Sequence, residues 1–165
     1  MSGQLSYSYQ TPRGIAGSLY DLAPYAINSR LNAEDTPGAL KYGMGAIIGD
    51  TPGVSVLAPG AAATPEQFEG IVMTGFTNQM NMQGEVNIYP QQTVGVLRYG
   101  NAWVRVAPDE EPEYGDSLYL IITGANAGMF STIDTNMPVM GRFIGGLGTG
   151  NIAPVELFNQ KNVSE

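Results

Sequence analysis

The chain has 165 residues, which is enough for one domain with a sizeable hydrophobic core and leaves little for a second. Only 13% of the residues are charged, yet the formal net charge is −8, so we expect no binding to the negatively charged backbone of a nucleic acid. Cysteine and histidine are both absent, which excludes disulfides, Cys/His zinc sites, cysteine nucleophiles and histidine relays.

The first 38 residues differ from the rest of the chain in the spacing of their apolar residues. They contain Tyr7, Tyr9, Tyr20 and Tyr25, but no sustained helix or strand periodicity, so we expect neither a long strand nor an amphipathic helix. The start of the chain lacks the pattern of a secretory signal, and no apolar run is long enough for a membrane anchor. Because the segment is rich in aromatic residues, we predict an extended arm at 1–38 that becomes ordered on another surface. An arm folded back onto its own domain is the alternative.

Short apolar runs separated by glycine and proline follow from residue 39 onward. This pattern predicts a compact antiparallel β barrel or sandwich over residues 39–160, with a C-terminal tail at 161–165. The strands are expected at 45–48, 54–57, 70–76, 85–89, 118–122, 129–133, 138–144 and 154–158. One short helix is expected after Thr64, with Pro65 at its first position, Gln67 completing a capping box and Gly70 ending it.

Residues 94–107 alternate between apolar and other side chains, with Gly100 and Asn101 in the middle. A glycine tolerates the positive φ of a two-residue turn, so the pattern predicts a hairpin with its tip at these two residues. In that register Leu97 lies opposite Val104 on a face that is apolar throughout. We expect this face to cover the core.

The other face of the predicted hairpin carries Arg98, Trp103 and Arg105. The register sets Arg98 directly across from the indole, and such a pair contributes about 0.5–1 kcal/mol when exposed. Tryptophan and arginine are also the residues that most often anchor interfaces. These three residues are therefore candidate interface anchors, and a tryptophan half-buried under its neighbours is the alternative.

Two loops are candidates for contact or ion binding. The loop 77–84 is polar but holds Met80 and Met82, whose adaptable side chains suit a contact surface; a simple exposed loop is the alternative. The loop 109–116 is strongly acidic, yet its spacing differs from that of a calcium-binding loop and its prolines restrict how the oxygens converge. We interpret it as a solvated loop, with a cation site as the alternative.

No catalytic constellation is apparent. Lys41 and Lys161 are the only lysines, and neither a G-x-S-x-G nor an S-x-x-K motif occurs. The acidic residues gather in one loop and are not split across a cleft as in glycoside hydrolases. We predict that the protein is not an enzyme and uses no cofactor or metal, and a small hydrolase using carboxylates is a remote alternative.

The order of several small-residue motifs resembles that of the capsid decoration, or structural cement, proteins of tailed bacteriophages. These motifs span residues 13–158 and are RGIAG (13–17), AINSR (26–30), YGMGAIIG (42–49), TPEQFEGIV (64–72), YGDSLY (114–119), GRFI (141–144) and APVEL (153–157). The resemblance implies a β barrel or sandwich without catalytic residues. It also implies a protein made in the host cytoplasm that binds the major capsid protein on the outside of the head and bridges neighbouring subunits.

Partners follow from this resemblance together with the arm. We expect the major capsid protein and further copies of this chain, as a homotrimer in preference to a dimer, and neither nucleic acid nor membrane. The expected contact residues are Tyr7, Tyr9, Arg13, Ile15, Leu19, Tyr20, Tyr25, Met80 and Met82. The alternative function is a non-catalytic module that binds a ligand or a host surface through Trp103, the tyrosines and the Asn/Gln-rich loop.

Overall fold

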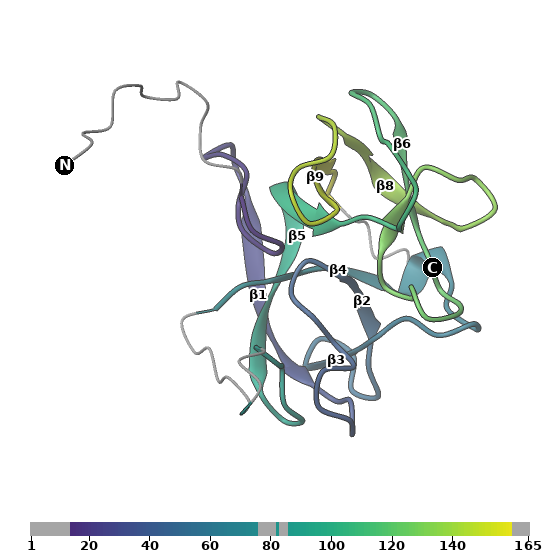
Figure 1. The fold of residues 1–165 in the computed structure, drawn as a ribbon. Coiled ribbons are helices and arrows are strands. Elements are labelled where there is room, and N and C mark those ends of the chain that lie inside the picture. Colours follow the sequence, from purple (N-terminus) through teal and green to yellow (C-terminus); the bar gives the residue numbers. More distant parts are fainter. Residues whose placement is uncertain (1–13, 76–81, 83–85, 160–165) are drawn as a thin grey trace.

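Nine β-strands make up almost all regular structure in the computed structural model, which describes residues 14–75, 82 and 86–159 (Figure 1). The strands are β1 (Ala26–Asn32), β2 (Gly45–Ile48), β3 (Ser55–Leu57), β4 (Phe68–Met73), β5 (Thr93–Arg105), β6 (Ser117–Leu120), β7 (Phe130–Ser131), β8 (Met137–Phe143) and β9 (Ile152–Leu157). A single 3-10 turn, η1 (Pro65–Gln67), is the helical element of this part of the chain. The predicted mainly β class is confirmed.

Five of the strands close into a barrel. Their order is β1-β3-β2-β4-β5, and β5 pairs back with β1 to complete the ring. The pairings are antiparallel except for β1 with β3, which run parallel. Closure gives each of these strands a neighbour on both sides within the barrel, and β5 continues beyond it from Gly100.

A second group of strands extends from the C-terminal half of β5. Here β5 pairs with β9, β9 with β8, β8 with β6 and β6 with β7, all antiparallel. A parallel bridge between Val106 and Phe130 returns this group to the end of β5. Figure 1 shows the two groups of strands joined along β5, which belongs to both.

The hairpin predicted at Gly100 and Asn101 is wrong, because β5 is one strand of 13 residues. Gly100 does have a positive φ of 130°, but the chain continues forward instead of reversing. The residues before Gly100 pair with β1 and β4, and those from Gly100 onward pair with β9. Both halves thus find partners far away in the sequence, so the expected pairing of Leu97 with Val104 does not form.

The expectation that residues 1–38 hold no long strand is also wrong. Strand β1 lies within this segment and pairs with β5 from Ala26 to Leu31. Its exposed and less exposed residues alternate, and its last residue, Asn32, is fully buried. The side-chain amide of Asn32 donates to Tyr89 O (3.0 Å). This bond fixes the end of β1 to the loop before β5. The boundary of the arm at residue 38 stays a prediction.

Two hydrophobic clusters form the core. One draws on the barrel strands and includes Val56, Val72 and Val96. The other lies between the barrel and the second group of strands and includes Ile71 and Phe130. Successive residues of β4, Ile71 and Val72, belong to different clusters, because neighbouring side chains of a strand point to opposite faces. Strand β4 is therefore buried on both faces.

The remaining expectations hold in part. Pro65 begins η1 and Thr64 N donates to the side chain of Gln67 (3.1 Å) as predicted, but the turn ends there because Phe68 already starts β4. Residues 87–89 are irregular, so no strand occupies the described part of 85–89. The other predicted strands correspond to β2, β3, β4, β6, β7, β8 and β9, with ends shifted by a few residues.

Candidate functional site

The N-terminal segment 14–21 lies along the C-terminal half of β5. Backbone hydrogen bonds join Gly17 N to Trp103 O (2.8 Å), Trp103 N to Ser18 O (2.9 Å) and Tyr20 N to Asn101 O (2.9 Å). A bridge pairs Leu19 with Ala102. The segment thus adds to the edge of β5 that β9 leaves free, and its backbone is held without a partner protein.

Close packing at Gly17 fixes the segment further. Its φ is +83°, and a Cβ at this position would lie 3.0 Å from backbone atoms of Gly43, Val72 and Thr74. Thr74 N also donates to Gly17 O (2.8 Å). Leu19 packs against the core, so it anchors the segment from the inside. The described part of the predicted arm is therefore docked on its own domain, as in the alternative interpretation.

Several large apolar side chains on this segment and on the residues that follow it are nevertheless exposed. Large hydrophobic side chains with more than two fifths of their surface exposed are Ile15 (64%), Tyr20 (45%), Leu22 (91%), Tyr25 (46%) and Ile27 (41%). All five fall within 13 consecutive residues, and we call them the apolar stripe. Exposed apolar side chains that lie close together in sequence are candidate contact residues, because they gain stability only when a partner removes them from water.

The predicted contact residues divide into three groups. Ile15, Tyr20 and Tyr25 belong to the apolar stripe, and Met82 is fully exposed, whereas Leu19 points inward. Tyr7, Tyr9, Arg13 and Met80 lie outside the described residues. Sequence reasoning missed Leu22 and Ile27, which no periodicity marks as exposed. Only the pairing of β1 with β5 shows that Ile27 faces outward.

The predicted pair of Arg98 and Trp103 does not form, because both residues lie on the same strand. Instead Trp103 is half-buried and meets the ring of Tyr20 edge to face, with 5.5 Å between centroids. A Cβ at Gly14 would lie 2.0 Å from the indole nitrogen, so this position needs a glycine beside the ring. Trp103 therefore helps to hold the N-terminal segment, and its role as an interface anchor stays a prediction.

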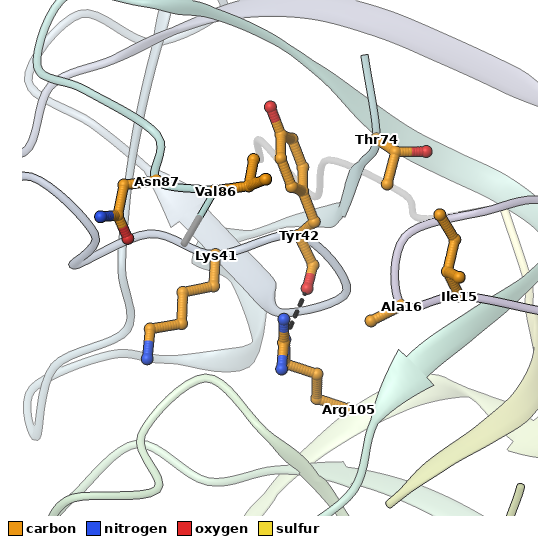
Figure 2. Close-up of a pocket in the computed structure, with 8 residues that line it drawn as sticks. All are labelled: Ile15, Ala16, Lys41, Tyr42, Thr74, Val86, Asn87 and Arg105. Atoms are coloured by element: carbon orange, nitrogen blue, oxygen red, sulfur yellow. Dashed lines mark hydrogen bonds between the residues drawn. The ribbon is translucent and has the colours of Figure 1, made fainter. Parts of the chain in front are cut away.

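Arg105 lies in a hollow of about 440 Å³ beside the N-terminal segment (Figure 2). Its Nε donates to Tyr42 O (2.7 Å), and its burial lowers the pKa of the guanidinium. Figure 2 shows Lys41 on the same side of the hollow as Arg105. The lining residues are Ile15, Ala16, Lys41, Tyr42, Thr74, Val86, Asn87 and Arg105.

The acidic loop 109–116 is held by one of its own carboxylates. Glu110 accepts hydrogen bonds from Ser131 Oγ (2.7 Å), Thr132 N (2.7 Å) and Thr132 Oγ1 (3.1 Å). Glu111 and Glu113 remain exposed. Over the described ranges, no group of three or more acidic residues is placed to hold a metal ion.

We expect Glu110→Ala to destabilise the protein by about 2 kcal/mol, because three donors lose a charged acceptor. Thermal unfolding would measure the loss, and proteolysis should cut the loop 109–116 faster in the variant. Glu111→Ala, on the exposed side of the same loop, is the matched control and should change the melting temperature little. Equal stability of the two variants would contradict the anchoring role of Glu110.

Comparison with known families decides the class of this protein. The model of the family described as "Structural cement protein", a phage family, matches residues 4–158. The chain belongs to the phage structural cement proteins. The family is named for a structural, capsid-stabilising role, and this role places the cement protein in the virion. The resemblance noted from the motif order is thereby confirmed.

The fold of this cement protein is also found in a solved structure. A chain from the structure called "The capsid of Myoviridae Phage XM1" matches with a TM-score of 0.68 and 20% sequence identity, covering 95% of this chain and 98% of that one. At this identity the likeness shows the fold alone. No curated protein matches the sequence. None of the described segments of the cement protein forms a helix that could span a membrane.

Proposed function

We propose that this cement protein sits on the outer surface of a phage head and stabilises it by bridging neighbouring subunits of the major capsid protein. The observation that carries the proposal is the apolar stripe, which is exposed although the backbone on both sides of Leu22 and Tyr25 is hydrogen-bonded to β5. A segment that is anchored at both ends loses less conformational entropy on binding than a loose arm. Each large side chain that becomes fully buried contributes about 1.5–3 kcal/mol.

Many symmetric copies on one head would multiply this contribution. A protein that binds the assembled shell but not its free subunits stabilises the shell by mass action. The rest of the proposal follows the expectations from sequence: the protein is made in the host cytoplasm and attaches as a homotrimer, with no catalytic step. The chemistry of the stripe, apolar with two tyrosine hydroxyls, suits a protein surface with a matching apolar seam.

The combined substitution of Leu22→Ser and Tyr25→Ser tests the stripe. We expect it to weaken retention on heads at least about tenfold, since truncated central interface residues typically cost about 1–2 kcal/mol or more each. Both side chains are exposed, so the fold should be retained. Cosedimentation with heads stripped of the protein would measure the change. Point substitutions are preferable to deleting residues 1–30, because that deletion would remove much of β1.

Val54→Ser and Ile133→Ser form the matched control, because these residues are similarly exposed (54% and 49%) but lie outside the stripe. The control should bind heads like the parent protein. If the stripe variant is folded and its retention is unchanged, the stripe is not the capsid contact.

A further inference from the structure

The hollow beside the N-terminal segment is lined by two cations, Arg105 and Lys41, and by no carboxylate among the described residues. Elsewhere in the described chain, Arg30 pairs with Glu69 (2.7 Å) and Arg142 with Glu156 (2.8 Å). Arg105 forms no ion pair with a described residue. Burying a charge is costly unless a partner compensates it.

The geometry of Arg105 leaves it ready to bind an anion. Its Nε is occupied by Tyr42 O, while its two terminal nitrogens have no acceptor among the described residues. This single hydrogen bond fixes the planar guanidinium, which can then receive both oxygens of a carboxylate. Lys41 adds an exposed, flexible ammonium at the same side of the hollow (Figure 2). Ile15 and Val86 supply apolar walls around the charged groups.

The chain itself carries a complementary feature. Glu111 and Glu113 are exposed on the acidic loop and form no ion pair with described residues, while Glu110 fixes the loop to Ser131 and Thr132. Loop carboxylates that are held in place lose less entropy on binding than those of a loose loop. The hollow and the loop thus carry charges of opposite sign, and neither forms an ion pair among the described residues.

We propose that the hollow of one copy binds Glu111 or Glu113 of a second copy. Since the hollow and the loop are different surfaces, the contact is head-to-tail, and repetition around an axis closes a ring when the rotation fits. This inference rests on the self-association proposed above and names the surfaces that produce it. It does not involve the apolar stripe beyond Ile15, so the rest of the stripe stays available for the capsid.

Charge reversal in the purified full chain tests the contact. Sedimentation equilibrium should show that the parent protein self-associates and that added salt weakens the association. Lys41→Glu should raise the dissociation constant at least tenfold, and Glu111→Lys with Glu113→Lys should do the same. Combining all three substitutions should restore only part of the association, because the glutamate introduced at position 41 then faces the introduced lysines while Arg105 still carries a positive charge in the hollow. Lys41 and both glutamates are exposed, so the variants should fold.

Arg98→Glu is the matched control, since Arg98 is an exposed cation that does not line the hollow. It should associate like the parent chain. A parent protein that stays monomeric at every concentration overturns both this contact and the proposed homotrimer. Association that ignores the reversals overturns only the contact. If Lys41→Glu associates normally but no longer binds heads, the occupant is a capsid carboxylate and not a second copy.

Discussion

Gly70→Ala is expected to destabilise the protein by about 3 kcal/mol or more, which is a large part of the stability of an ordinary domain. Gly70 is buried in β4 with a φ of +154°, and a Cβ there would lie 2.1 Å from the carbonyl oxygen of Leu97 in the neighbouring strand. The contact is with backbone, so no side chain can rotate away. The strands β4 and β5 would have to separate, and both belong to the closed barrel.

Thermal unfolding provides the measurement. For a chain of this size, about 3 kcal/mol corresponds to a fall in melting temperature of roughly 6–12 °C. Gly60→Ala is the matched control, because a Cβ at that position would have nothing within 4 Å. That control should stay within about 0.5 kcal/mol of the parent protein. A Gly70→Ala protein that melts with the control would show that β4 and β5 can separate at this point at little cost.

Phe130→Ala is expected to cost about 3–5 kcal/mol, because it empties a fully buried site between the barrel and the second group of strands. Phe130 lies on β7 and meets Phe68 of β4 edge to face, with 6.4 Å between ring centroids. It also accepts a hydrogen bond from Ala107 N (3.0 Å) through its carbonyl. The ring therefore connects the last strand of the sheet to the barrel.

Denaturant unfolding with a linear extrapolation would measure this loss. Phe130→Leu keeps much of the apolar volume, so it should cost clearly less, about 1.5 kcal/mol or below. If Phe130→Ala loses less than about 1 kcal/mol, the site collapses easily or the two layers are less tightly joined than the contacts indicate. Both core variants act on folding, whereas the stripe and hollow variants act on exposed groups. Failure to fold and failure to bind can thus be told apart.

A structural role explains the distribution of polar chemistry in this chain. Five of its exposed large apolar residues lie within residues 15–27, and its acidic residues include one carboxylate, Glu110, used to fix a loop. Such features add binding surface and rigidity. A cement protein acts by lowering the free energy of an assembly, so persistent contact serves it better than turnover.

The sequence by itself determined the class of the fold and several local features. Period-2 alternation and frequent glycine and proline predict short strands, and the Thr64-Pro65-Glu66-Gln67 pattern predicts the turn that η1 forms. The absence of histidine and cysteine limits the chemistry to what the other side chains supply. The order of small motifs along the chain was enough to indicate the family. These properties depend on composition or on neighbours within a few residues.

Only the tertiary structure decided which strands pair and which apolar residues stay exposed. Alternation shows that a segment is a strand but does not name its partner, and β5 takes its partners from β1, near the start of the chain, and β9, near its end. Gly100 has the positive φ of a turn residue and yet lies within a continuous strand. The exposure of Leu22 and the lack of an ion pair between Arg105 and any described residue likewise follow from long-range packing. Which backbone groups pair and which side chains become buried depends on residues from all parts of the fold. A local sequence pattern therefore cannot determine either.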